Sequence, residues 1–315
     1  MGNGTRNPKK SDGLLGKGER VLIYRFIDAE KANYPIRILC RVLDLPQSSY
    51  FDWNRQGRLL AAERGVVDAV IVAEIREVHA WSGGTYGAVK ICDRMRKRGR
   101  RISCRRVAEL MAEHRIQGVC GREPGVRTTI RDRHPWPFPD LVQRRFRPCR
   151  PDVVWYSDIT YIWVGGRFWF LATVIDAATK QVVGWAFADH MRTDLVIDAL
   201  HAAVRRRGRP RPGIIFHSDR GSQYTSNEFG RVCALYKMKQ SMGYTGVCWD
   251  NAGAESFFAT LKRELIHRYR WDNATALHQD LYWWIEAWYN NNRTHLTLGL
   301  RTPNQAHQDH YRTAA

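Results

Sequence analysis

The stretch VVWYSDITYIWVGGRFWFLATVI, residues 153–175, decides the class of fold. Both of its arms are rich in β-branched and aromatic residues, which favour strands. Gly165-Gly166 between the arms is a two-residue turn signal, so we expect a β-hairpin of strands 153–164 and 168–175. This pattern begins an antiparallel sheet in the second half of the chain.

The residues after the hairpin predict helices and strands in alternation. We expect a strand over 181–188, a helix capped by Thr193, a short buried strand over 214–217, a helix capped by Ser226 and a fifth strand over 237–242. Long helices follow. Hairpin strands succeeded by alternating elements are typical of a mixed α/β sheet.

The residues before the hairpin predict two pairs of short helices. Residues 34–43 have apolar side chains at helical spacing, Asp44-Leu-Pro46 interrupts them, and Ser48 can cap a second helix. A similar pair covers 86–98 and a helix capped by Ser103. Helix, tight turn and helix form a DNA-reading unit in many proteins, although either pair alone also fits a simple α-hairpin.

The charge of the chain points to a polyanionic partner. The 315 residues include 50 Lys plus Arg and 31 Asp plus Glu, a net charge of +19. Residues 91–150 hold 17 of these bases and 6 of these acids, a net of +11. Such clustering suits phosphate contacts and favours nucleic acid, while the alternative is a basic surface that serves solubility alone.

Other broad classes of protein do not fit the sequence. The longest largely apolar run, 168–175, is far shorter than the ~20 residues of a membrane span, and residues 1–10 have no apolar signal segment. None of the seven cysteines forms a Cys-x-x-Cys pair. We therefore expect a reduced cytoplasmic protein without structural zinc, whose cysteines are mostly small buried apolar residues.

Three acidic residues in the second half are candidates for catalysis. Asp158 lies inside a predicted strand, where Asp is disfavoured; Asp219 follows the strand 214–217; Glu255 borders the apolar stripe of a predicted helix. Converging carboxylates hold Mg²⁺, and two such ions promote phosphodiester hydrolysis and transesterification. A paired strand acid, a turn cap and a surface helix acid are the alternative interpretation.

Lys262 adds a cation to the same predicted helix. It follows Glu255 by seven residues, about two helical turns or ~10.5 Å along one face. A carboxylate that binds metal and a lysine on one face can hold neighbouring phosphates of one DNA strand. The alternative is a solvated helix lysine.

Three segments together resemble a known family: WYSDITY (155–161), HSDRGSQYTS (217–226) and WDNAGAESFFATLKRE (249–264). They are similar to the OrfB transposases of insertion sequences typified by insertion sequence 3, which belong with retroviral integrases among the DDE recombinases. The 35 residues between Asp219 and Glu255, and a basic residue seven positions after the Glu, match that family's pattern. The resemblance extends to Tyr289-Asn290, Arg293, His295 and Pro303, while Gly253 stands where the family commonly has a larger residue.

The resemblance implies a fold, a reaction and a set of residues. The core would be ribonuclease H-like, a mixed five-stranded sheet with helices, preceded by an all-α helix-turn-helix region. Asp158 would bridge two Mg²⁺ ions, Asp219 and Glu255 would complete one each, and Mn²⁺ would substitute. The enzyme would nick the element's ends to leave a 3′-OH and then join that end to target DNA. Candidate DNA contacts are Lys262, Arg220, Gln223, Arg105 and Arg106.

The sequence and the resemblance together predict five regions. These are a helical region at 1–75, a second helix-turn-helix region at 76–120, a basic Pro-containing linker at 121–150, the catalytic core at 151–270 and a C-terminal helical segment at 271–315 packed on the core.

The expected partners are those of a bacterial transposase. They are double-stranded DNA carrying the terminal inverted repeats, the target DNA and further copies of the chain, with an upstream-frame protein or frameshift fusion as an option left open; no membrane is expected. The expected location is the bacterial cytoplasm, at the nucleoid when bound to DNA. Two alternatives stay open: a ribonuclease H-like metal nuclease without strand transfer, and a DNA-binding regulator with an inactive core.

Overall fold

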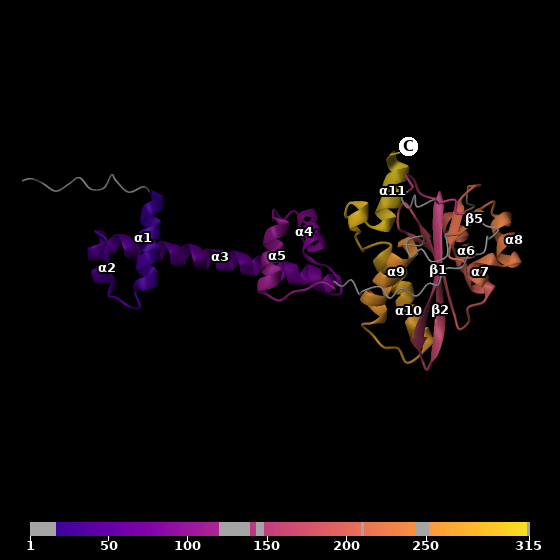
Figure 1. Ribbon diagram of the computed structural model, residues 1–315, viewed down its shortest axis with the longest axis horizontal. Coiled ribbons are helices and arrows are strands. Elements are labelled where there is room, and N and C mark those ends of the chain that lie inside the picture. Colours follow the sequence, from indigo (N-terminus) through magenta and orange to yellow (C-terminus); the bar gives the residue numbers. More distant parts are fainter. Residues whose placement is uncertain (1–16, 120–138, 143–147, 209–210, 243–251, 314–315) are drawn as a thin grey trace, which may run out of the picture. The chain divides into compact units, whose positions relative to one another are not determined.

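The computed structural model describes residues 17–119, 139–142, 148–208, 211–242 and 252–313 (Figure 1). The chain divides into two compact units, 1–74 and 75–315, which are described separately. Most of the predicted linker 121–150 lies outside the described residues. The five-region division made from the sequence stays a prediction.

The first unit contains α1 (Lys17–Glu30), α2 (Ile36–Val42) and most of α3 (Gln47–Trp81). The predicted interruption after α2 is confirmed, since Asp44 takes a positive φ of 52°. The three helices bury one apolar cluster: Tyr24, Ile27, Leu39, Cys40 and Tyr50. Ser48 is not the cap that we expected, because α3 begins at Gln47.

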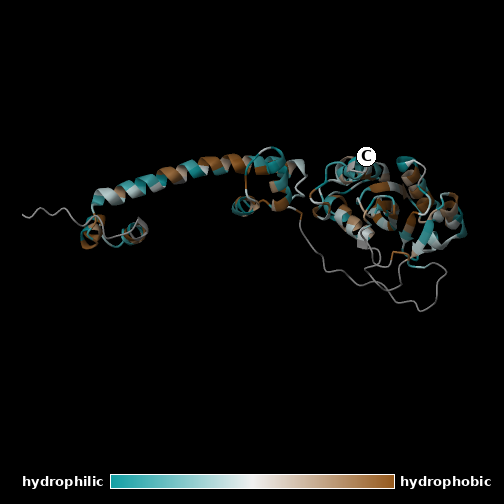
Figure 2. Cartoon of the chain, turned by 90° about the horizontal axis from the view of Figure 1, so that it is seen from above, coloured by the Kyte–Doolittle hydropathy of each residue, from teal (hydrophilic) through white to brown (hydrophobic). Residues whose placement is uncertain are grey.

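The helix α3 is much longer than the short helix predicted from the sequence. Residues 58–64, RLLAAER, are good helix formers and contain no Pro, so the helix continues through them for 35 residues in all. Figure 2 shows apolar colouring along this long helix. Several of its apolar side chains are exposed: Leu59, Leu60, Val66, Val67 and Val70.

The second unit opens with the predicted pair of helices, α4 (Ala88–Lys97) and α5 (Cys104–Glu113). The Ser103 hydroxyl accepts a hydrogen bond from the Arg106 N–H at 3.1 Å, which confirms Ser103 as the cap of α5. Cys92 and Cys104 form a disulfide between the two helices, with Cα atoms 5.3 Å apart. The expectation of reduced cysteines is wrong at this pair, because the turn between the helices brings the two side chains together.

The mixed sheet predicted from the sequence is confirmed. It contains β1 (Val154–Val164), β2 (Arg167–Asp176), β3 (Val182–Ala188), β4 (Ile215–Ser218) and β5 (Lys239–Met242), in the order β3-β2-β1-β4-β5. The first three strands are antiparallel, and β4 and β5 run parallel to β1. Gly165 and Gly166 form the β1–β2 turn with φ of 58° and 80°.

One face of the sheet is covered by α6 (Thr193–Arg207), α7 (Ser222–Thr225) and α8 (Asn227–Leu235), which pack on Trp155 and Phe216. Gly184 of β3 permits close packing, since a Cβ there would lie 2.2 Å from the Ala199 carbonyl oxygen of α6. Ser226 caps α8, as predicted. Thr193 does not cap α6, because Arg192 occupies the cap position.

The remaining helices are α9 (Ala252–Leu261), its π-helical continuation η1 (Lys262–Ile266), α10 (Ala274–Tyr282), the π-helical η2 (Trp283–Tyr289), the short η3 (Leu296–Leu298) and α11 (Pro303–Thr313). The side chain of Asn290 both accepts from and donates to the backbone of Val182 at 3.0 Å, which ties this segment to β3. Among the described residues, no helix has the length and apolar character needed to cross a bilayer.

Candidate active site

Two neighbouring strands place Asp158 and Asp219 side by side. β1 and β4 run parallel with Tyr156 opposite His217, and the two rings lie 5.8 Å apart. Asp158 and Asp219 each stand two residues further along. Because side chains alternate across a strand, Asp158 leaves the same face of the sheet as Tyr156, and Asp219 directly follows the end of the neighbouring β4.

The helix α9 brings Glu255 to this same face. A Cβ on Gly253 would lie 2.7 Å from Cδ2 of Tyr156, so the first turn of α9 packs directly against the β1 ring. Trp155 packs on the opposite face under α6, as alternation along β1 requires. The glycine that departs from the family pattern is therefore the residue that permits this close approach.

The charges of Asp219 and Glu255 both act on Asp158. Burial raises its pKa to about 7, the Asp219 and Glu255 carboxylates raise it as well, and the Ile159 N–H and the Lys262 ammonium oppose them. The Asp158 Oδ1 accepts the Ile159 N–H at 2.8 Å. A carboxyl group that is desolvated and surrounded by like charge is poised to gain a proton or a cation.

The other two acids are perturbed in the same direction. Desolvation raises the pKa of Asp219, although its Oδ1 accepts the Gly221 N–H at 3.1 Å, which lowers it. Desolvation also raises the pKa of Glu255. The group thus concentrates negative charge at one point of a strongly basic chain.

This arrangement fits divalent cations in its chemistry, since three oxygen-donating acids with raised pKa values are stabilised by positive charge. Its geometry is not that of a finished metal site. Within the described parts of the chain, no three His, Cys, Asp or Glu side chains lie close enough to hold an ion. The assignment of metal ligands therefore depends on charge and desolvation.

Lys262 follows α9 at the first residue of η1. Its ammonium group stands 5.5 Å from the centre of the Tyr161 ring on β1 and lowers the pKa of Asp158. η1 begins at this residue, and π-helical turns occur often at functional sites.

The other candidate DNA contacts lie in two places. Gln223 is in α7, where its Nε2 donates to the Met191 carbonyl at 2.8 Å, and Arg220 directly follows Asp219. Arg105 and Arg106 lie on α5 and pair with Glu109 at 2.9 and 3.4 Å. Their role as DNA contacts stays a prediction.

Two features near the carboxylates were not predicted. The Tyr224 hydroxyl is 2.9 Å from the Ser157 hydroxyl, and burial with the charges of Asp158 and Asp219 raises its pKa, so the phenol stays neutral beneath the acids. Glu264, the end of the third motif, forms a buried ion pair with Arg293 at 2.8 Å. No local pattern announces either contact, because each joins residues far apart in sequence.

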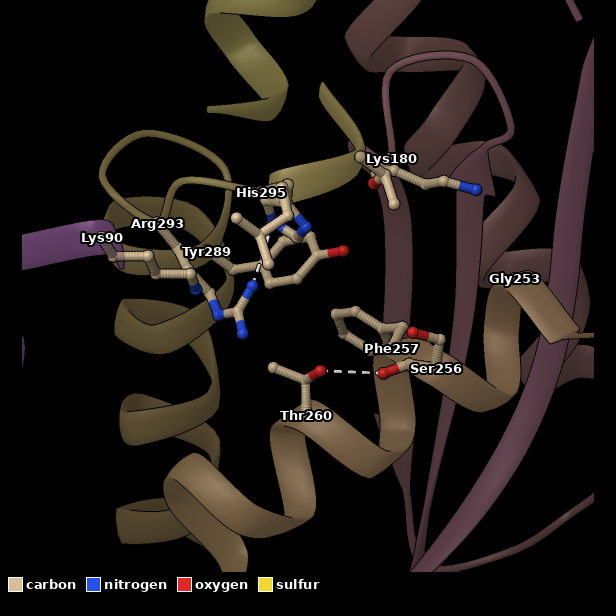
Figure 3. Close-up of a pocket in the computed structure, with 11 residues that line it drawn as sticks. Lys90, Lys180, Gly253, Ser256, Phe257, Thr260, Tyr289, Arg293 and His295 are labelled. Carbon is tan, nitrogen blue, oxygen red and sulfur yellow. Dashed lines mark hydrogen bonds between the residues drawn. The ribbon is translucent and has the colours of Figure 1, made fainter. Parts of the chain in front are cut away.

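A cavity of about 460 Å³ also lies beside α9 (Figure 3). Its basic and hydroxyl side chains come from α4, the β2–β3 turn, α9 and the C-terminal segment: Lys90, Lys180, Ser256, Thr260, Arg293 and His295. Sequence reasoning identified Arg293 and His295 only by their resemblance to the family.

Comparison with known families agrees with this architecture. The chain matches the integrase core domain over residues 148–248 and a second integrase core domain family over 236–303. It matches an HTH-like domain over residues 67–124, which include α4 and α5.

Named relatives match nearly the whole chain. The transposase InsF for insertion sequence IS3A from Escherichia coli K12 is 32% identical over 287 residues, which are 90% of this chain and 97% of InsF. The transposase for IS629 from Shigella sonnei is 34% identical over 290 residues, 90% of this chain and 95% of that protein.

Among solved structures, the HTLV-2 integrase catalytic core in complex with magnesium superposes with a TM-score of 0.39 at 19% identity, covering 51% of this chain and 99% of the integrase core. The ribonuclease H-like fold expected from the sequence is confirmed by the sheet together with the integrase core matches. This chain belongs to the family of insertion-sequence transposases of the IS3 type, with an integrase core and an HTH-like domain.

Proposed function

We propose that this transposase binds the ends of its insertion sequence, nicks each end to leave a 3′-OH, and joins that end to target DNA with Asp158, Asp219 and Glu255 as its catalytic carboxylates. The observation that carries the proposal is the raised pKa of all three acids, to which the charges of Asp219 and Glu255 add at Asp158. Structural acids are paired with cations, as Glu264 is with Arg293, whereas the raised pKa values of these three acids favour added positive charge.

The three carboxylates would hold two Mg²⁺ ions, as the family resemblance implies, and Mn²⁺ would substitute for Mg²⁺. Such ions activate an attacking oxygen and stabilise the leaving oxygen of a phosphodiester. In the first step water cleaves one bond and leaves a 3′-OH and a 5′-phosphate. In the second step the 3′-OH attacks a target phosphodiester and displaces another 3′-OH, so the number of phosphodiester bonds is conserved.

The chain's own residues position the DNA for these steps. The Lys262 ammonium, which lies over the Tyr161 ring, would contact a phosphate beside the one that reacts. Arg220 and Gln223 border Asp219 in the loop and α7 that follow β4. The exposed Arg105 and the half-buried Arg106 of α5 are candidates for end recognition by the HTH-like domain.

The experiment is a strand-transfer assay on pre-cut element ends, with the divalent cation as a variable. Asp158→Asn, Asp219→Asn and Glu255→Gln are each expected to lower joining by about a hundredfold to a thousandfold, the usual cost of losing a charge-stabilising group. Asp198→Asn, which removes an exposed acid of α6, is the matched control and should join ends at the normal rate.

Each outcome separates the candidate functions. Hydrolysis with no joined product would identify a nuclease and contradict the proposal. Complete absence of cleavage with Mg²⁺ or Mn²⁺ would identify a DNA-binding regulator.

Two further parts of the proposal follow from the reaction. Two ends must be joined together, so we expect several copies of the chain on DNA, alone or with an upstream-frame fusion. We also expect the enzyme to act in the bacterial cytoplasm, where its DNA lies.

A further inference from the structure

The cavity beside α9 is separate from the carboxylate site. Gly253, Ser256, Phe257 and Thr260 line it, and their spacing of three, four and seven residues places them on one face of the helix. Glu255 and Lys262 fall on the opposite face by the same periodicity. The periodicity of α9 therefore puts Glu255 on one side of the helix and the cavity-lining residues of Figure 3 on the other.

The cavity is basic. Lys90 of α4, Lys180 of the β2–β3 turn and Arg293 of the C-terminal segment line it, whereas no acidic side chain is among its lining residues in the described part of the chain. Glu264 pairs with Arg293 and offsets one of the three charges. The charges of Lys90 and Lys180 act on the cavity as well, since both lower the pKa of His295 in its lining.

The pKa of His295, which lines the cavity, responds to these positive charges. Burial lowers its pKa well below the usual value, and the charges of Arg293, Lys90 and Lys180 lower it further. The neutral ring lies against Arg293, whose Nη1 is 3.4 Å from the His295 Nε2. Three cations from separate segments thus act on one imidazole.

The remaining lining offers donors for an oxyanion. Ser256, Tyr289 and Thr297 present hydroxyl groups, whereas the Thr260 hydroxyl already donates to the Ser256 carbonyl at 2.9 Å. The volume of about 460 Å³ far exceeds the ~30 Å³ share of one water and admits a phosphodiester group. Converging cations and hydroxyls are the means by which proteins bind phosphate.

We propose that this cavity is a second phosphate site, which takes a backbone phosphate of the bound DNA on the side of α9 opposite the catalytic carboxylates. The DNA assignment rests on the proposed function, whereas the phosphate chemistry does not. A phosphate held there contacts α4 of the HTH-like domain and α9 together. End binding is thereby linked directly to the helix that carries Glu255.

The first experiment uses inorganic phosphate as the probe and His295 as the reporter. Phosphate, added at constant ionic strength against chloride, is expected to raise the pKa of His295 measured by NMR of the labelled imidazole, since an anion offsets the three cations. Lys90→Gln and Ser256→Ala should weaken phosphate binding severalfold, and arginine in place of Lys90 (Lys90→Arg) should retain it. Lys97→Gln is the matched control, because Lys97 lies on α4 but bonds the Leu300 carbonyl outside the cavity.

The second experiment adds a duplex that carries the terminal repeat. DNA is expected to displace phosphate from His295, and Lys90→Gln should reduce the salt dependence of DNA affinity by about 0.9 in log–log slope, the value for one phosphate contact. Thermal melting of each variant identifies any that fail to fold, and the other variant then carries the test.

Every outcome bears on the proposal. If phosphate leaves His295 unchanged, or if Lys97→Gln weakens binding as much as Lys90→Gln, the cavity is not a phosphate site. If phosphate binds but DNA does not displace it, the site takes a free anion and the DNA assignment is overturned. If the wild-type protein binds phosphate but joins no DNA ends in the strand-transfer assay, the proposed function is contradicted and the anion site remains supported.

Discussion

One helical segment, residues 252–266, contributes acids to two groups that behave in opposite ways. Glu255 of α9 joins Asp158 and Asp219, and burial raises the pKa of all three acids. Glu264 of η1 is also buried, yet it accepts two nitrogens of Arg293 and the Trp288 indole N–H. The first group gathers like charges, and the second pairs every charge.

The difference indicates that two acids of one helical segment have different roles, Glu255 in the reaction and Glu264 in the stability of the fold. A buried acid that is paired and hydrogen-bonded holds segments together, as Glu264 holds η1 to the C-terminal segment. A group of desolvated acids destabilises the fold unless a cation joins it, and proteins retain such groups where they act. The substitutions below test the paired acid Glu264 and the group of three acids separately.

The largest expected effect on stability comes from breaking the paired group. Glu264→Gln leaves the buried Arg293 guanidinium without its carboxylate, and removal of one partner of a buried pair costs about 3–5 kcal/mol. The free energy of unfolding in urea measures the loss. Glu264→Gln combined with Arg293→Met should recover part of it, and a loss below ~1 kcal/mol in the single variant would show that the pair is not structural.

Removal of a charge from the group of Asp158, Asp219 and Glu255 is expected to stabilise the fold, whereas Glu264→Gln destabilises it. The pKa of Asp158 is about 7 in the folded chain and about 3.8 unfolded, so folding favours the protonated acid. Its stabilising contribution is complete below pH ~4 and is lost as pH rises through 7. Asp158→Asn should therefore raise the melting temperature of the metal-free protein, by more at pH 8 than at pH 5.

The measurement is a series of melts with a chelator, from pH 5 to pH 8. Added Mg²⁺ should stabilise the wild type more than Asp158→Asn, since the ion replaces the proton. If Asp158→Asn raises the melting temperature equally at pH 5 and pH 8, the raised pKa of Asp158 is contradicted.

The smallest expected effect concerns Lys262, which is half-buried against Tyr161. Lys262→Ala removes one phosphate contact and should lower the salt slope of end binding by about 0.9, with little change in melting temperature. The exposed Lys239 of β5 supplies the control Lys239→Ala. An unchanged slope for Lys262→Ala would make this residue an ordinary surface lysine.

Local patterns predicted much of the fold correctly. The β1–β2 hairpin, the turn at Gly165-Gly166 and the caps at Ser103 and Ser226 depend on neighbouring residues alone, and the structure has each of them. The helix α3 was predicted too short, because good helix formers extend a helix until something breaks it. The Cys92–Cys104 disulfide was missed because it depends on how two helices pack.

The candidate site likewise has features that the sequence predicts and features that depend on packing. The sequence by itself determined which residues are available: three acids at characteristic positions, a lysine seven residues after the last one, and a basic stretch upstream. Spacing along a strand or helix fixes which side chains share a face, so the positions of Asp158, Asp219, Glu255 and Lys262 along the chain are enough to select them as candidates.

Only the tertiary structure decided which charges are paired and which remain exposed to one another. It joined Glu264 to Arg293, set three cations around His295, and placed the cavity behind α9. The physical reason is that desolvation and Coulomb interactions depend on distances between segments far apart in sequence. Local patterns can identify a charged residue, but only packing determines what that charge faces.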